Sequence, residues 1–168
     1  DWRNGAAYPT NGYQWSWTSR LAMPGHIKFF NYFKTDFDIS WYTPLIGEDT
    51  LVLCLHGHAG LIKTLKNKNA PWIELFHVGG PASVRGYNYG QIGPTWKEDN
   101  SLGALKMLIF NAELIFPIAA DRSMRGIVFY DGGAGWDTPL ANEMSPKNLS
   151  NNNFFYRFHV VIKNIFIF

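Results

Sequence analysis

Apolar and polar residues alternate along several segments of this chain, and a spacing of two predicts β-strands with two unlike faces. The clearest segment is 33–41, in which all even positions are polar and the apolar residues hold odd positions: Phe33, Phe37, Ile39 and Trp41. The same alternation runs through 51–61 and 106–116 and, less regularly, through 13–20, 72–78, 126–133 and 154–161. The pattern therefore predicts a largely β chain with about seven strands.

Turn-forming residues separate these segments, at 9–12, 24–25, 46–49, 66–71 and 137–153, which predicts a meander of strands. One connection differs from the others, because residues 79–103 contain six glycines and two prolines and show no periodicity. Long irregular connections in compact folds are usually functional or disordered. The aromatic residues Tyr87 and Tyr89 favour an ordered loop here.

The alternation leaves two fold classes open. A soluble β-sandwich would bury the apolar rows in a core between two sheets. A transmembrane β-barrel would turn the rows outward to lipid, and strands of about nine to eleven residues with aromatic rings near their ends fit that class. The rings in question are Trp15, Trp17, Trp41, Tyr42, Trp72 and Phe76.

Composition narrows the function classes. The 168 residues are enough for one structural unit, which could be a piece of a larger protein. Charged residues make up only 17%, against about 25% in typical soluble domains. The net charge of +2 is too small to suggest a nucleic-acid partner. No apolar run approaches the 18 to 20 residues of a membrane-spanning helix, and the start at Asp1, with no Met or leader, favours a cut N-terminus.

Candidate chemistry is sparse. Cys54, His56 and His58 share one face of the segment 51–61 and could bind a soft metal. No fourth ligand is apparent, however, and polar residues that line a water-filled interior explain the pattern without a metal. Neither a phosphate-binding motif nor a hydrolase motif accompanies the glycines at 132–135 or Ser83, so we expect no cofactor and no catalytic residues.

The loop at 79–103 carries the sequence Val84-Arg85-Gly86-Tyr87, which resembles the Val-Arg-Gly-Phe/Tyr loop of the BamA-like outer-membrane assembly factors. Five further stretches are similar to that family's strands and turns in the same order: 8–13, 92–94, 101–104, 111–117 and 129–138. The resemblance covers residues 8–158. It departs after Phe158, where the family continues with a Gly-rich strand and a final strand.

The resemblance implies a fold and a site. Residues 1–168 would be the C-terminal part of a sixteen-strand barrel that follows periplasmic POTRA domains, and loop 79–103 would fold into its lumen. Arg85 at the loop tip would contact Glu113 and Asp131 on two neighbouring strands. The alternation independently puts Glu113 opposite an apolar row, whereas Ile127 and Phe129 share the side of Asp131. About seven strands could not close a barrel without further strands.

The resemblance also implies a function, which requires no enzyme chemistry. The parent protein would insert unfolded outer-membrane proteins into the bacterial outer membrane, with lipid and accessory assembly lipoproteins as further partners. Mitochondrial or plastid outer membranes are alternative locations. Two other functions stay open, namely a two-partner secretion transporter that exports a polypeptide and a soluble β-sandwich binding module.

Overall fold

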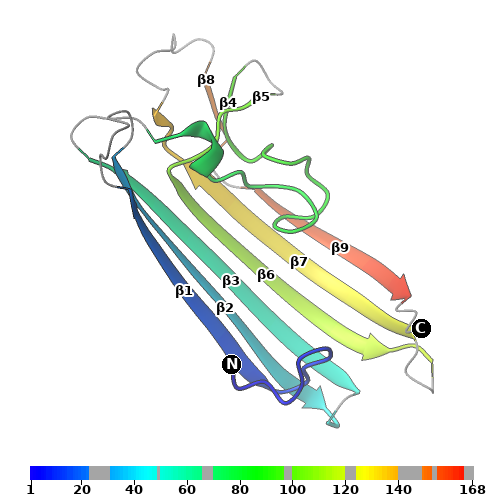
Figure 1. The fold of residues 1–168 in the computed structure, drawn as a ribbon. Helices are drawn as coiled ribbons and strands as arrows, with labels where there is room; N and C mark the ends of the chain where they lie inside the picture. Colours follow the sequence, from blue (N-terminus) through cyan, green and yellow to red (C-terminus); the bar gives the residue numbers. More distant parts are fainter. Residues whose placement is uncertain are drawn as a thin grey trace.

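The computed structural model describes residues 1–22, 31–48, 50–65, 70–96, 100–119, 124–139, 149–152 and 155–164. Within these ranges six strands form one antiparallel sheet in the order β1-β2-β3-β6-β7-β9 (Figure 1). The strands are β1 (Gly12–Ala22), β2 (Tyr32–Ile46), β3 (Leu51–Thr64), β6 (Lys106–Pro117), β7 (Met124–Trp136) and β9 (Phe155–Asn164). A smaller sheet pairs β4 (Gly93–Trp96) with β5 (Asn100–Ser101) and β8 (Leu149–Asn152).

The strand predictions are confirmed for most of the sheet. The predicted segments 13–20, 33–41, 51–61, 106–116 and 126–133 lie inside β1, β2, β3, β6 and β7, and 154–161 overlaps β9. Chain neighbours pair as the meander requires, including β3 with β6 across the long connection. The turn expected at 24–25 lies outside the described residues.

The strand predicted at 72–78 is wrong. Trp72–Glu74 form a single 3-10 turn, η1, directly after Pro71. Phe76 and Val78 then make only isolated bridges, to Ala104 and Ile92. The alternation in this segment has another cause, because Phe76 and Val78 are buried against the sheet instead of pairing in a ladder.

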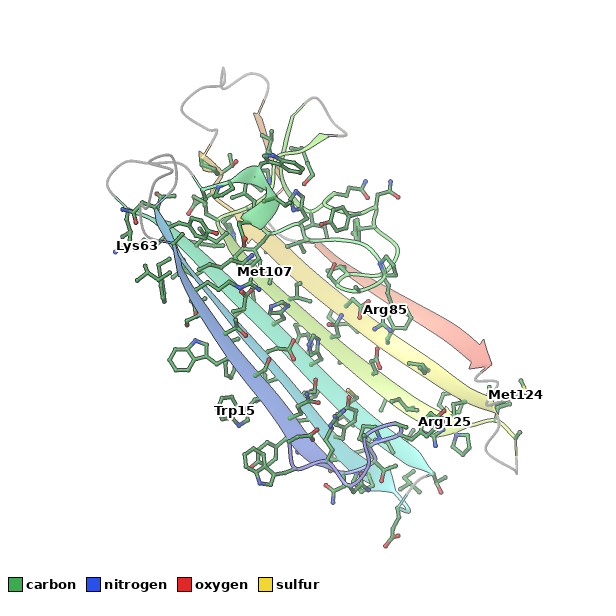
Figure 2. All side chains as sticks on the ribbon, viewed as in Figure 1. Trp15, Lys63, Arg85, Met107, Met124 and Arg125 are labelled. Atoms are coloured by element: carbon green, nitrogen blue, oxygen red, sulfur yellow. The ribbon has the colours of Figure 1, made fainter. Side chains whose placement is uncertain are left out.

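The register gives the sheet two unlike faces, because residues directly opposite each other in an antiparallel pair share a face. Trp15 lies opposite Ile39, and Phe37 lies opposite Ala59 on the same side. This side is exposed: 69% of Trp17 and 45% of Phe110 remain accessible. In Figure 2 Trp15 projects away from β1, clear of the ribbon. The soluble β-sandwich is therefore wrong, since within the described ranges these apolar rows are exposed and meet no second sheet.

The opposite face is covered at one end by the segment between β3 and β6, which lies over the sheet in Figure 1. A hydrophobic cluster joins the two layers. The sheet contributes Ile62, Met107 and Ile109, and the connecting segment contributes Leu75, Phe76, Val78, Val84, Ile92 and Ala104. This cluster positions the loop relative to the strands, which is what the site described below requires.

Glycines in β7 allow the loop to approach the sheet closely. A Cβ on Gly133 would lie 2.6 Å from Cγ2 of Val84 and 3.0 Å from Cγ1 of Val78. A Cβ on Gly135 would lie 3.1 Å from the Cβ of Ala104. No side chain fits at Gly133 without displacing the loop, so this glycine sets the spacing between the two layers.

The N-terminal segment folds back over the start of β1. Trp2 donates its backbone N–H to the carbonyl of Tyr13 at 2.9 Å, and the two rings stack 4.9 Å apart. The guanidinium of Arg125, at the start of β7, lies 4.5 Å from the centre of the Tyr8 ring. The segment thus links the first strand to a strand four places along the sheet.

In the described ranges, no helix has the length and apolar character needed to cross a membrane.

We predict that Gly133→Ala in the full-length parent protein weakens the docking of the loop by about 1–3 kcal/mol, the usual cost of overpacking. Trypsin cleavage after Arg85 in the folded protein should then be faster than in the wild type. Gly57→Ala in β3 is the matched control, because a Cβ there meets only Cγ2 of Ile39 at an ordinary 3.5 Å. Equal cleavage rates for the two variants would contradict the proposed spacing role of Gly133.

Candidate functional site

Arg85 lies between the loop and the strands, above β7 (Figure 2). The preceding residue, Val84, is fully buried in the hydrophobic cluster, and Tyr87 packs against the edge of that cluster. Gly86 adopts a φ of +84°, a left-handed conformation that favours glycine. Buried Val84 and the turn at Gly86 therefore hold the backbone of Arg85 so that its side chain points at the sheet.

Asp131 receives three hydrogen bonds from Arg85. The guanidinium donates from Nε to Oδ2 and from Nη2 to Oδ1, both at 2.6 Å, and the backbone N–H of Arg85 donates to Oδ2 at 3.0 Å. The side chain of Asp131 is completely buried. A bidentate pair of this kind defines orientation as well as distance, because both N–H vectors must meet both oxygens.

Glu113 binds the third guanidinium nitrogen, with Nη1 of Arg85 2.6 Å from Oε1. This carboxylate is 22% exposed and so retains contact with solvent. The guanidinium also lies 3.5 Å from the centre of the Phe129 ring, a cation–π contact. Phe129 and Asp131 lie on the same, inward side of β7, where the ring contacts the guanidinium. Because an apolar ring lies on the polar face here, alternation alone could not assign the two sides of this strand.

Both carboxylates keep Arg85 charged. Burial by itself lowers the pKa of the Arg85 guanidinium, but its hydrogen bonds with Asp131 and the negative charge of Glu113 outweigh that effect, so that the pKa is raised. The site is thus a cation held by two carboxylates.

Further residues extend this site, and of these the sequence analysis singled out only His56, as a possible metal ligand or an interior polar residue. Asn111 in β6 donates from Nδ2 to Oδ1 of Asp131 and to the backbone carbonyl of Ser83, both at 2.8 Å. Nδ1 of His56 in β3 lies 2.9 Å from Oδ1 of Asn111, and Nε2 of His56 lies 2.7 Å from Oδ2 of Asp38 in β2. His56, Asn111 and Asp131 lie directly opposite one another on three adjacent strands. The sequence feature that could have identified this network is the presence of a polar residue at the matching position of each strand.

The metal hypothesis for Cys54, His56 and His58 has little geometric support. Both ring nitrogens of His56 contact Asn111 and Asp38, so neither is directed at a shared ligand position. His58 lies near another carboxylate, with Nε2 3.6 Å from Oδ1 of Asp36. The described part of the chain contains no group of three or more His, Cys, Asp or Glu side chains placed to hold a metal ion.

A two-faced antiparallel sheet with an exposed apolar side and an ion-paired loop on its polar side defines a segment of an outer-membrane β-barrel. A family model for the Omp85 superfamily domain matches residues 1–163, and the chain belongs to this family. The BamA-like resemblance and the partial-barrel fold expected from the sequence are thereby confirmed.

Individual relatives agree with this assignment. The chain is 33% identical to the outer membrane protein assembly factor BamA of Neisseria meningitidis serogroup B over 140 residues, which cover 79% of this chain and 17% of the relative. It is 29% identical to a SAM50-like protein of Schizosaccharomyces pombe over 153 residues, 87% of this chain and 30% of the relative. The crystal structure of BamA from Haemophilus ducreyi lacking POTRA domains 1–3 matches with a TM-score of 0.73 at 26% identity, over 84% of this chain and 29% of that one. The chain thus spans less than a third of each relative.

We predict that Asp131→Asn and Glu113→Gln loosen the loop to different degrees. Removing the charge of buried Asp131 should cost about 3–5 kcal/mol of loop docking, because the guanidinium keeps its charge without its buried partner. Removing that of solvent-accessible Glu113 should cost about 1 kcal/mol. Hydrogen–deuterium exchange of the loop amides in the full-length parent measures both losses, and a larger effect for Glu113→Gln would contradict this ranking.

Proposed function

We propose that this chain is part of an assembly factor that folds outer-membrane proteins and inserts them into the bacterial outer membrane. The observation that carries the proposal is the clamp of loop 79–103, in which Arg85 binds Asp131 and Glu113 on the polar face of the sheet. The relatives from Neisseria meningitidis and Schizosaccharomyces pombe support it, since the first is named an outer-membrane assembly factor and the second is named SAM50-like.

The two faces of the sheet support a place inside a larger barrel. In a closed barrel the exposed apolar rows would contact acyl chains, and the polar face with its loop would line the interior. Lipid tolerates no unpaired strand edge, since each unsatisfied backbone group costs several kcal/mol. In this proposal residues 1–168 therefore form the C-terminal part of the barrel domain, and other strands of the parent complete it. Loop 79–103 then lies in the lumen.

The clamp suits a mechanical role. A loop held by a bidentate ion pair, a cation–π contact and a hydrophobic cluster has one preferred position on the barrel wall. A loop with a defined position would preserve the shape of the barrel lumen while neighbouring strands move. Insertion then needs no covalent step and no cofactor, and the chain is not an enzyme. Its partners are the unfolded outer-membrane protein substrates, the surrounding lipid and accessory assembly lipoproteins.

Export by a two-partner secretion transporter is the less favoured function. The relative from Neisseria meningitidis is named an assembly factor, which favours assembly over export. The number of POTRA domains encoded upstream of this chain separates the two functions, since five would indicate assembly and two would indicate export.

We predict that Arg85→Ala in the full-length parent leaves the barrel folded but slows substrate insertion. The expected loss is about tenfold or more, which corresponds to about 1.4 kcal/mol or more of activation free energy. The measurement is the rate at which a urea-unfolded small β-barrel becomes heat-modifiable on gels in liposomes that contain the parent. Arg85→Lys should restore little, because an ammonium cannot reproduce the bidentate geometry.

The control for this experiment is Lys63→Ala, which removes an exposed cation at the end of β3, far from the clamp (Figure 2). Its insertion rate should equal that of the wild type. Wild-type insertion by Arg85→Ala, in a barrel shown to be folded, would refute the role of the clamp in assembly.

A further inference from the structure

We infer that His56 is a positioning residue that acts as an imidazolium cation and ties the Arg85 clamp to β2 through Asn111. The inference builds on the proposed role of the clamp and extends it to a pH-sensitive support. It rests on a chain of side chains that runs from Asp38 through His56 and Asn111 to Asp131 and crosses four strands of the sheet.

The orientation of the Asn111 amide follows from its neighbours. Its two contacts at 2.8 Å are the backbone carbonyl of Ser83 and a carboxylate oxygen of Asp131, and both groups can only accept hydrogen bonds. The amide nitrogen must face them and spend both of its N–H groups there. The flipped amide would instead point its oxygen at two acceptors. Oδ1 of Asn111 therefore faces His56.

The protonation state of His56 follows in turn. Oδ1 of Asn111 has no proton to give, so Nδ1 of His56 must donate across the 2.9 Å contact. An aspartate is ionised near neutral pH and can only accept, so Nε2 must donate to Asp38 across 2.7 Å. A histidine that donates from both nitrogens carries a positive charge.

The charge balance around the clamp favours the same state. Asp38, Glu113 and Asp131 contribute three negative charges and Arg85 contributes one positive charge, a net of −2. A cationic His56 reduces this net to −1. The titratable and charged groups around His56 are Asp38 and Tyr42 on β2, Cys54 and His58 on β3, Glu113 on β6, Asp131 on β7 and Arg85 in the loop.

Loss of one proton breaks the chain whichever nitrogen is left bare. If Nδ1 is bare, its lone pair faces the oxygen of Asn111 and that contact becomes repulsive. If Nε2 is bare, it faces the carboxylate of Asp38 and the link to β2 is lost. In the first case Asn111 loses the donor that holds its amide oxygen. In the second case the imidazole keeps that bond but loses its own anchor on Asp38, so the ring holds Asn111 less firmly. By either route Asn111 is less well fixed against Asp131 and the carbonyl of Ser83, and the loop tip gains freedom without any change in Arg85 itself.

The first experiment reads the proton directly. The full-length parent, with ¹⁵N-labelled histidine, is placed in lipid bilayers at pH 7 and studied by solid-state NMR, and the His56 signal is assigned by its loss in His56→Gln. We expect both ring nitrogens of His56 to be protonated. A neutral tautomer, with one bare ring nitrogen, would overturn the inference regardless of how any variant behaves.

The second experiment reads the loop. A spin label at Ala82→Cys, in a parent whose other exposed cysteines are replaced, reports loop-tip mobility between pH 5 and pH 9. In the wild type a mobile component should grow as pH rises. In His56→Gln the mobile component should be present at every pH, because glutamine has no proton to lose in this range.

His58→Gln is the matched control, because His58 lies two residues along β3 on the same face, is similarly exposed and pairs with Asp36 instead of Asn111. It should keep the wild-type pH response. A response that survives in His56→Gln, or disappears in His58→Gln, would overturn the inference.

These readouts are independent of substrate insertion. If Arg85→Ala inserts substrate normally while His56 proves cationic and loop mobility follows its titration, the proposed function fails and the support role of His56 stands. If Arg85→Ala is impaired while His56 is neutral, the support role alone fails.

Discussion

The structure depends on how one partly buried guanidinium, that of Arg85, is satisfied. Arg85 donates to both oxygens of a completely buried Asp131, and a buried charge left without its partner costs several kcal/mol. The pair therefore favours one position of the loop tip. Glu113 and the ring of Phe129 complete the surroundings of the guanidinium, so that two adjacent strands hold a loop that belongs to neither of them.

The rest of the inner face is built to let that pair form. Val84 sits buried one residue before the arginine, and Gly133 leaves the room that Val84 occupies. Asn111 donates a hydrogen bond to Asp131 through its amide nitrogen and contacts His56 through its amide oxygen, so it connects Asp131 to β3 and, through His56, to β2. Because the outer face is apolar and exposed, these polar contacts are concentrated on the side that carries the loop. The inward side of the sheet thus supplies the two carboxylates of the clamp, and the loop supplies the arginine.

The strands were predictable because their signal is local. Segment 33–41 alternates so regularly that only one of its faces could be apolar, and in the structure it lies inside β2. Segment 72–78 alternates too, yet it forms a 3-10 turn and two isolated bridges. Its apolar residues pack against the sheet, and among the described residues no strand pairs with it in a ladder. Periodicity describes which side chains share a face, and it cannot show what that face contacts.

The sequence by itself determined the two-faced strands, the irregular loop at 79–103 and the inward side of Glu113, since each depends on residues close together in the chain. Only the tertiary structure decided that the Phe129 ring, on the side of Asp131, lies against the guanidinium of Arg85. It alone also decided that Asp38, His56 and Asn111 join one network. Those contacts depend on strand register and on how deeply the loop settles. Register is set by pairing between residues that lie as many as 63 positions apart along the chain, as Val52 and Ile115 do.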